Sequence, residues 1–261
     1  MSTTIRLGSL ILAGLIIGFC VSCQPSRVEG GRAIGGVTPE EMYSDRGVVS
    51  LVEAVLADDG SRIHQLSTKG VDVDSLPEGG VPPLIWAVHF DRLSALKALL
   101  ASGADACQPI PALYGDSAIV VAVRTNKLGQ LKAFLSGGTD PNCPISDTTE
   151  LSLLSMAVSS GTIEAVRELV EAGADVNAGQ DTDSVVLRAQ AFGRYDIALY
   201  LLKHGYHHSL KEVAISAQRR LVSARSEESR QAVISYLRAK GVEIPVKGPL
   251  DRGELDEASS D

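Results

Sequence analysis

Histidines are the side chains in this sequence whose type and spacing first suggest chemistry, because three of the five lie close together. His204, His207 and His208 could offer imidazole nitrogens to a metal ion, but a metal site also needs further ligands at defined spacing. The neighbouring sequence offers no convincing carboxylate or thiolate for this role. We therefore expect a polar surface cluster, with no metal site and no cofactor.

Catalytic motifs of other kinds do not occur. The sequence contains no Gly-x-Ser-x-Gly motif, no phosphate-binding loop and no His-Glu-x-x-His motif. Adjacent acids such as Asp58 and Asp59, or Glu40 and Glu41, fall in a predicted turn and a predicted tether, where solvated carboxylates are expected. We predict that the protein is not an enzyme. The alternative, a metal-dependent enzyme that uses the histidine cluster, would require a bound metal ion.

The sequence contains a repeated unit, and the helices and turns of this unit would position any functional site. Residues 166–177 describe one copy: an apolar helix ends at Gly173, which can adopt the left-handed backbone conformation, and a turn follows. Equivalent glycines follow other apolar helix ends at spacings of 33, 35, 35 and 32 residues: Gly70, Gly103, Gly138, Gly173 and Gly205. A period of this length indicates a repeat protein.

Four further columns of residues keep the same distance from these glycines. A small residue sixteen positions earlier suits close helix packing: Ala54, Ala87, Ala122, Ala157 and Ala189. An apolar residue stands nineteen positions earlier: Leu51, Leu84, Ile119, Leu154 and Val186. Types that tolerate left-handed geometry stand twelve positions earlier: Asp58, Asp91, Asn126, Gly161 and Gly193. An apolar residue four positions earlier predicts the buried face of a second helix: Leu66, Leu99, Phe134, Leu169 and Leu201.

These units resemble the ankyrin-repeat family, most clearly in Gly103-Ala-Asp105, in residues 173–177 and in the Gly-Val-Pro-Pro-Leu stretch of residues 80–84. The resemblance implies an all-α ankyrin-repeat solenoid of about six helix-hairpin units with short β-turn tips, degenerate first and last units, over residues 47–245. The family's Thr-Pro-Leu-His histidine is absent, so we expect weaker ties between turns and helices. Its position is occupied by Val52, Ile85, Val120, Ser155 and Leu187.

Residues 1–22 resemble a bacterial lipoprotein signal peptide. Arg6 precedes an apolar run of 13 residues, which is too short to span a bilayer. Cys23 follows Ser22 as in a lipobox, so lipidation of Cys23 is predicted, although Cys20 departs from the usual residue at its position. The expected location is the periplasm, with the lipid in the inner leaflet of the outer membrane of a Gram-negative bacterium. An ordinary secreted protein and a retained anchor are the alternatives.

The segments beside the repeats have different compositions. Residues 23–46 are predicted to be the lipidated cysteine and a flexible tether, because they are rich in Gly, Ser and Pro. Residues 210–221 and 229–239 predict two more helices of a capping unit, joined by a charged connection. Residues 246–261 are acidic and nearly free of apolar residues, which predicts a disordered tail.

Charge excludes one class of partner. The formal net charge is −8, and removal of residues 1–22 makes it −9, because Arg6 is their only charged residue. A nucleic-acid-binding protein would show a basic face, so nucleic acid is not an expected partner. An acidic array suits a basic protein partner or simply solubility.

Cys107 and Cys143 are the cysteines that remain besides the predicted lipidated one. Both follow the glycine turn of neighbouring repeats. A disulfide is chemically permitted in the periplasm, but equivalent points of adjacent repeats are farther apart than the ~7 Å between Cα atoms that a disulfide allows. The two extra residues in this unit could close the gap. A Cys107–Cys143 disulfide and two separate thiols are both open.

The function that follows is protein binding. Ankyrin proteins generally bind partners with the ends of the first helices and the tips between units. By position this surface includes His89, Phe90, Arg124, Thr125, Ser159, Phe192, Glu78, Asp181 and Asp183, with Tyr114 and Asp116 in a lengthened loop. Phe90 and Phe192 are large and apolar outside the core columns, so each either anchors a partner or covers the edge of a neighbouring unit.

An acidic repeat lipoprotein without enzymatic motifs resembles immunity lipoproteins that neutralise secreted antibacterial effectors, such as lipases delivered by type VI secretion. We therefore expect another protein, such as a secreted toxin or lipase effector, as the partner, and membrane contact through the N-terminal lipid anchor only. An envelope scaffold or adaptor that organises periplasmic proteins is the alternative function.

Overall fold

The computed structural model describes residues 33–145, 151–160, 162–179, 184–219 and 224–244. The chain divides into two compact units, Met1–Asp140 with Pro144–Thr149 and Pro141–Cys143 with Glu150–Asp261. Apart from an isolated β-bridge between Ile34 and Val37, the regular structure of the described residues is helical, so the fold is all-α. Each unit is described by itself below.

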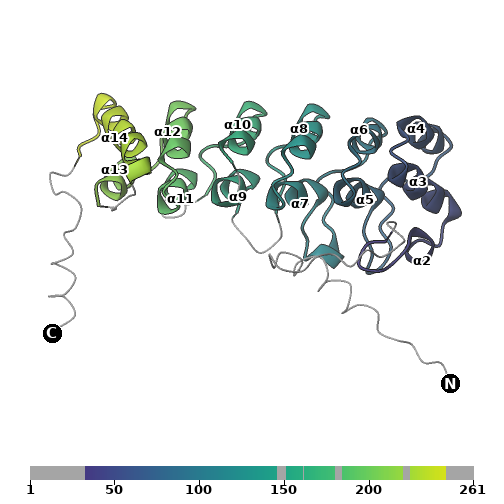
Figure 1. Cartoon of the computed structure of the whole chain (residues 1–261). Helices are drawn as coiled ribbons and strands as arrows, with labels where there is room; N and C mark the ends of the chain where they lie inside the picture. The colour runs from purple at the N-terminus through teal and green to yellow at the C-terminus, as the bar shows by residue number, and fades with distance from the viewer. Residues whose placement is uncertain (1–32, 146–150, 161, 180–183, 220–223, 245–261) are drawn as a thin grey trace, which may run out of the picture. The chain divides into compact units, whose positions relative to one another are not determined.

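The first unit consists mainly of three helix hairpins (Figure 1). The helices that form these hairpins are α3 (Arg46–Leu56) with α4 (Gly60–Thr68), α5 (Pro83–His89) with α6 (Leu93–Ala101), and α7 (Ala118–Arg124) with α8 (Leu128–Ser136). A short helix, α2 (Pro39–Met42), precedes them, and a 3₁₀ turn, η2 (Pro111–Leu113), lies in the loop before α7. The first helix of each hairpin contacts the first helix of the next, and the second helices do the same.

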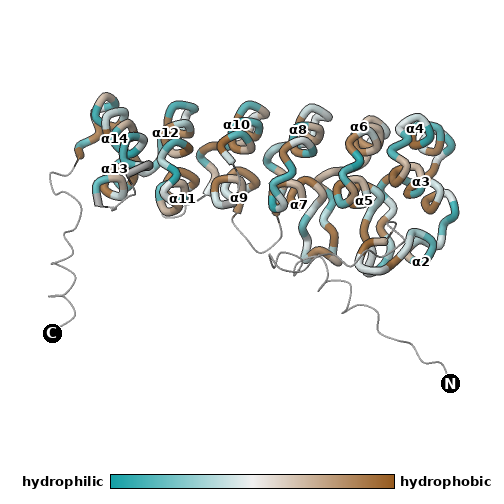
Figure 2. The backbone as a smooth tube through the Cα atoms, viewed as in Figure 1, coloured by the Kyte–Doolittle hydropathy of each residue, from teal (hydrophilic) through white to brown (hydrophobic). Residues whose placement is uncertain are grey.

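The second unit also consists of three pairs. These are α9 (Leu153–Ser160) with α10 (Ile163–Glu171), α11 (Val185–Ala191) with α12 (Tyr195–Lys203), and α13 (Leu210–Arg219) with α14 (Ala224–Ala239). Both hydrophobic and hydrophilic residues occur along the helices of each unit (Figure 2), as expected when one face of each helix is buried. The fold is therefore the predicted ankyrin-repeat solenoid of helix hairpins, while the continuity of the array over residues 47–245 stays a prediction.

The predicted columns form the core. Each of the five alanines, and each apolar residue of the columns nineteen and four positions before a glycine, is buried. The backbone predictions are confirmed as well: Asp58, Asp91 and Asn126 have φ values of 55°, 57° and 53°, and Gly193 has 68°. All five repeat glycines also have positive φ. Gly161 lies outside the described residues.

The N-terminal segment differs from the predicted tether, because ordered packing begins before residue 46. Ile34 is fully buried, and Thr38 and Glu41 form a reciprocal capping box at the start of α2. The buried Tyr43 hydroxyl donates a hydrogen bond to the Val81 carbonyl and accepts one from Trp86 Nε1 at 3.0 Å. Residues 33–46 contain few apolar side chains, but Ile34 and Tyr43 among them are buried. Residues 23–32 lie outside the described residues.

Side chains at the tips tie neighbouring repeats together through what we call the tip ladder. In this ladder the acceptor is the side chain four positions after the glycine of one repeat. The donor is the backbone N–H two positions after the glycine of the following repeat. Asp74 Oδ1 accepts from Asp105 N at 2.9 Å in the first unit. In the second unit, Asn142 Oδ1 accepts from the same position, Asp175 N, at 2.9 Å.

A second set of ties involves the residues with left-handed backbone conformation in the first unit. Asp58 Oδ1 accepts a hydrogen bond from Ala95 N, at the start of α6, at 2.7 Å. Asp91 Oδ1 accepts one from Gln130 Nε2 at 2.8 Å and pairs with Lys127 Nζ at 2.6 Å. These carboxylates connect turns to helices of the next repeat. Ties between turns and helices were expected to be weaker because the family's histidine is absent.

The last pair of helices differs from prediction in one respect. The charged stretch of residues 226–230, expected to be a connection, lies inside α14. Within this helix Arg230 has two partners: its Nη2 lies 2.6 Å from Glu227 Oε1, one turn earlier, and its Nη1 donates to the Ala217 carbonyl of α13 at 2.9 Å. Burial of the Arg230 side chain between α13 and α14 requires both partners.

Candidate protein-binding surfaces

The first helices of the first unit end in the predicted binding residues. His89 ends α5 and Phe90 caps it, while Arg124 ends α7 and Thr125 caps it. Thr125 Oγ1 donates to the Val121 carbonyl at 2.7 Å, which uses its hydroxyl within the helix. His89 and Arg124 therefore occupy equivalent exposed positions in successive repeats.

Phe90 lies against the core. Its ring stacks on the buried Trp86 ring with centroids 6.0 Å apart and planes at 17°, and the His89 ring meets its edge at 4.8 Å. These contacts favour the interpretation that Phe90 covers its own repeat. Although the residue as a whole is exposed, partial desolvation of the ring, together with the nearby Lys127 ammonium, lowers the pKa of the His89 imidazole.

Arg124 and Asp116 form an ion pair that joins the helix end to the lengthened loop. Arg124 Nη2 lies 2.8 Å from Asp116 Oδ2, and the Asp116 side chain is 16% exposed whereas that of Arg124 is 55% exposed. Burial raises the pKa of the Asp116 carboxyl, and the Arg124 guanidinium acts in the opposite direction. Two of the predicted residues are thus brought together, with Arg124 on the solvent side.

Tyr114 is 71% exposed. Among the large hydrophobic side chains of the described residues, it is more exposed than Phe192 and Leu93. Its backbone has φ 57°, a conformation that costs a residue other than glycine about 1 kcal/mol or more. The loop holds it there because Ile110 and Leu113 are buried and because Gly115 N donates to the Ile110 carbonyl at 3.0 Å. The loop is anchored by its apolar residues and presents a tyrosine to solvent.

Glu78 lies at another exposed tip of the first unit. It is the second residue of a turn that Gly80 N closes with a hydrogen bond to the Pro77 carbonyl at 2.9 Å. Gly79 beside it has φ 70°, which a side chain would disfavour. The turn therefore holds the Glu78 carboxylate in solvent.

The second unit carries the predicted residues Ser159 and Phe192. Phe192 caps α11 and is 56% exposed. Ser159 Oγ donates to the Ser155 carbonyl at 3.0 Å and lies 3.5 Å from Arg188 Nη1 of α11, so a contact that sequence reasoning missed joins the two first helices. Asp181, Asp183 and Cys23 lie outside the described residues, and their predicted roles stay predictions.

The cysteines and histidines complete the set of predicted residues. Cys107 and Cys143 are each disulfide-bonded, and their pairing with one another stays a prediction. Within the described ranges, no group of three or more His, Cys, Asp or Glu side chains is placed to hold a metal ion. Nor does any helix in those ranges have the length and apolar character needed to cross a membrane.

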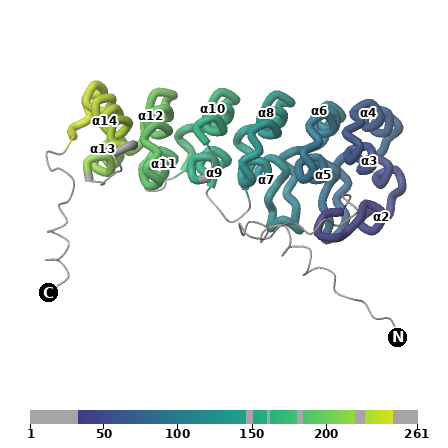
Figure 3. The backbone as a smooth tube through the Cα atoms, viewed as in Figure 1, coloured from purple at the N-terminus to yellow at the C-terminus, as the bar shows by residue number. Residues whose placement is uncertain are grey.

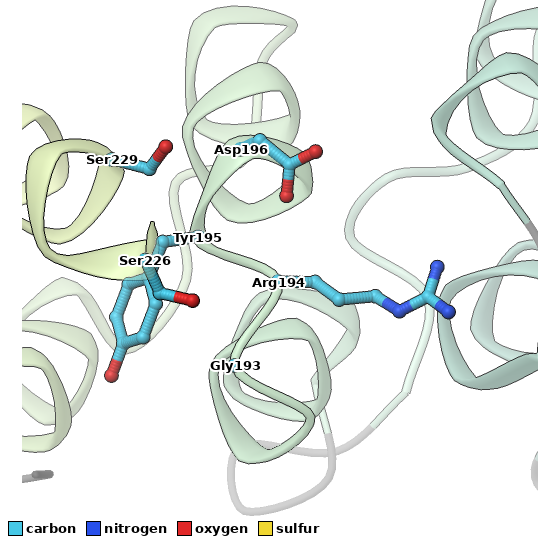
Figure 4. Close-up of a pocket in the computed structure, with 6 residues that line it drawn as sticks. All are labelled: Gly193, Arg194, Tyr195, Asp196, Ser226 and Ser229. Carbon is cyan, nitrogen blue, oxygen red and sulfur yellow. The ribbon is translucent and has the colours of Figure 1, made fainter. Parts of the chain in front are cut away.

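A pocket between α12 and α14 of the second unit was not predicted. It has a volume of about 310 Å³ and is lined by Gly193, Arg194, Tyr195, Asp196, Ser226 and Ser229. Figure 4 shows that the Arg194 side chain extends away from the two serines, which come from the other helix. The polar residues that form the pocket are unremarkable in sequence, so only the packing of α14 on α12 could reveal it.

Comparisons with known proteins support the fold. Residues 119–212 match the family model described as "Ankyrin repeats (3 copies)". A search of curated proteins returned no match. The chain is similar to the crystal structure of the ankyrin repeat domain of Bcl-3, a member of the IkappaB family, with a TM-score of 0.57, 22% identity, and coverage of 76% of this chain and 89% of that one.

A second similar structure is that of EF0377, an ankyrin repeat protein. Its TM-score is 0.54 at 23% identity, with coverage of 74% of this chain and 98% of that one. At these identities the two structures establish the type of fold and leave function to be argued from this chain's own residues.

Proposed function

Since this chain carries ankyrin repeats and has their fold, we propose that it acts by stoichiometric binding of another protein and is not an enzyme. The observation that carries the proposal is Phe192, a large aromatic side chain left 56% exposed at a helix end. Exposure of such a ring costs solvation free energy, and rings of this kind anchor many protein interfaces.

The residues around Phe192 support this choice of surface. The first helices α9 and α11 carry Met156 and Arg188 but no carboxylate, although the whole chain has 32 acidic residues. Aromatic residues, Met and Arg are enriched in interface cores, while Asp and Glu are depleted there. Helices α9 and α11 therefore have the composition of an interface, in contrast to α13, the first helix of the third pair, which carries Glu212.

We propose further that the protein is a lipoprotein of the periplasm, attached through Cys23 to the inner leaflet of the outer membrane. The support is the sequence pattern of residues 1–23, in which a basic residue, an apolar run and a lipobox-like cysteine follow one another. Lipidation would contribute about 0.8 kcal/mol per buried CH₂, which is enough for stable attachment when several chains are present.

The partner we propose is a secreted antibacterial effector, such as a lipase delivered by type VI secretion, which makes this chain an immunity protein. Binding would cover the effector's active-site cleft or a surface it needs to engage the membrane. Electrostatic complementarity to the acidic chain would raise the association rate. The support is the combination of a binding fold, the proposed location and the absence of catalytic motifs from the sequence.

A second candidate function is an adaptor that organises several envelope proteins. The observation in its favour is that each unit has its own strongly exposed aromatic residue, Tyr114 in the first and Phe192 in the second. Two such residues could anchor two different partners. An immunity protein needs only one.

The experiment that tests the function is affinity purification of the tagged full chain from envelopes of the source bacterium. We expect one partner at one-to-one stoichiometry, encoded beside this chain, whose lytic activity the purified chain abolishes. The Phe192→Ala variant should lose the partner, and Lys97→Ala on the exposed side of α6 is the matched control. Recovery of several resident envelope proteins in place of one effector would favour the adaptor. Specific recovery of the partner by the Phe192→Ala variant, at the level of the Lys97→Ala control, would overturn the proposed surface.

A further inference from the structure

Helices α12, α13 and α14 follow one another at the C-terminal end of the second unit (Figure 3). Residues from the end of α12, the start of α13 and the end of α14 line a small pocket. Its volume is about 270 Å³. Leu202 and Leu210 supply apolar surface, and the rings of Tyr206 and Tyr236 supply aromatic surface. The Tyr236 hydroxyl donates to the Leu202 carbonyl at 2.9 Å, so α14 is held against α12 at this point.

Cations surround this apolar surface. Lys203 and Lys240 both line the pocket and are exposed, and His207 lies beside them. None of the described residues that line the pocket carries a carboxylate, although the chain has a net charge of −8. Leu210, the first residue of α13, also lines the pocket, whereas Lys203 and Lys240 stand at the C-terminal ends of α12 and α14. One positive and two negative ends of helix dipoles therefore lie at the pocket. The two lysine ammonium groups are therefore the charges that favour an anion at this pocket.

From this arrangement we propose that the pocket binds a small oxyanion, a phosphate or a carboxylate, that is joined to an apolar group. A lysine ammonium attracts such oxyanions as a point charge. The apolar part would contact Leu202, Leu210 and the tyrosine rings, and Lys240 Nζ already lies 5.7 Å from the centre of the Tyr236 ring. The volume is just below the ~300 Å³ at which pockets for drug-sized ligands begin, so only a small molecule or one residue of a larger partner fits.

One residue of the histidine cluster, His207, lines the pocket. The His207 and His208 rings stack with centroids 4.5 Å apart, and His207 Nδ1 lies 3.0 Å from the Gly205 carbonyl oxygen. A ring nitrogen at this distance from a carbonyl must donate its hydrogen. His207 is therefore held as part of the pocket wall, and the pocket offers an alternative to metal binding for this cluster.

The test uses the purified full chain in phosphate-free buffer at low ionic strength, with phenyl phosphate as the probe and benzyl alcohol as the uncharged control. We expect phenyl phosphate to shift the NMR signals of Leu202, Leu210 and Tyr236, with benzyl alcohol at least about tenfold weaker. The double variant Lys203→Gln/Lys240→Gln should weaken phenyl phosphate binding by about tenfold or more, since both lysines are exposed and the fold does not depend on them. Lys97→Gln should bind like the unchanged protein.

Three results would overturn the proposal: no binding of phenyl phosphate, equal binding of the uncharged control, or unchanged affinity in the double variant. A further arm separates the two sources of such an oxyanion. A short peptide that ends in phenylalanine is compared with its C-terminal amide. Tighter binding of the free acid than of phenyl phosphate assigns the pocket to a protein partner's terminus, whereas the reverse assigns it to a free small molecule.

This proposal does not rest on the proposed function. Phe192→Ala should leave phenyl phosphate binding unchanged, and the double lysine variant should leave the effector-binding surface intact. The two proposals can therefore fail separately.

Discussion

The Asn177 side chain connects two turns of the second unit through both of its polar atoms. Its Oδ1 accepts a hydrogen bond from His207 N at 3.1 Å, and its Nδ2 donates to the Gly205 carbonyl at 3.3 Å. Asn142 makes the same two bonds one repeat earlier, to Asp175 N and to the Gly173 carbonyl. An asparagine at this position holds the next turn by a donor and an acceptor together, which no carboxylate can do.

Asn177→Ala should destabilise the last repeats by about 1 kcal/mol, because two hydrogen bonds that are exposed to solvent are lost. Asn177→Asp keeps the acceptor and loses the donor, so its cost should be smaller. Urea unfolding measures the total effect, and amide hydrogen exchange over residues 205–219 locates it. An alanine variant as stable as the unchanged protein, with unchanged exchange, would show that the ladder does not hold the repeats.

Phe192 and Phe90 should respond in opposite ways to truncation. Phe192→Ala should weaken partner binding by about 2 kcal/mol or more with little change in Tm, because the ring is exposed. Phe90→Ala should lower Tm, because its ring covers Trp86. Phe134→Ala, a substitution of a fully buried ring, calibrates the cost of a core cavity at roughly 3–5 kcal/mol. A large loss of stability in Phe192→Ala with intact binding would assign that ring to the core.

Glu227→Gln should destabilise the protein in a pH-dependent way. Hydrogen bonds from Arg230 lower the pKa of the Glu227 carboxyl to about 2, so the folded state holds the proton less tightly than the unfolded chain. The stabilisation is therefore complete above the ordinary pKa of glutamate and is lost as pH falls toward 2. Solvent reaches this pair, so its size is on the order of 1 kcal/mol.

Urea unfolding of the Glu227→Gln variant and the unchanged protein between pH 7 and pH 2 provides the measurement for this pair. The difference in free energy of unfolding should shrink as the solution becomes acidic. A difference that is constant over this range would mean that the glutamine loses packing and not charge. Glu228→Gln, at an exposed neighbouring position, is the control and should show little change.

Cys23→Ser should release the protein from the membrane fraction, because a serine cannot carry the thioether-linked lipid. Fractionation of the source bacterium with detection of the chain in the soluble periplasm provides the measurement. Cys20→Ser is the matched control and should remain with the membrane. Unchanged membrane association of the Cys23→Ser protein would refute the lipoprotein assignment.

The repeats could be predicted because their signals are local. Local backbone geometry requires glycines at the positions with positive φ, and residues such as Asp58, Asp91 and Asn126 at the helix ends. Their spacing can therefore be recognised from the sequence. The buried columns follow from the period of a helix. Each of these features depends on neighbours along the chain.

Other features depend on residues that are far apart in sequence, and only the tertiary structure decided them. Tyr43 is separated from Trp86 by 43 positions, so its hydrogen bond could not be foreseen and residues 33–46 were expected to be a tether. Residues 226–230 were expected to be a connection because charge favours solvent, yet the Ala217 carbonyl gives Arg230 a partner inside a helix pair.

The candidate sites show the same division. The helix-end positions of Phe90 and Phe192 followed from the repeat, but their exposure did not, because it depends on whether a ring such as that of Trp86 lies beside them. The pocket around Tyr236 requires three helices to meet, and sequence periodicity carries no information about which side chains face one another across them. The sequence by itself determined the repeat and its turns through local backbone geometry. Tertiary packing decided which polar and aromatic side chains are buried, paired or left to solvent, because that depends on contacts between distant residues.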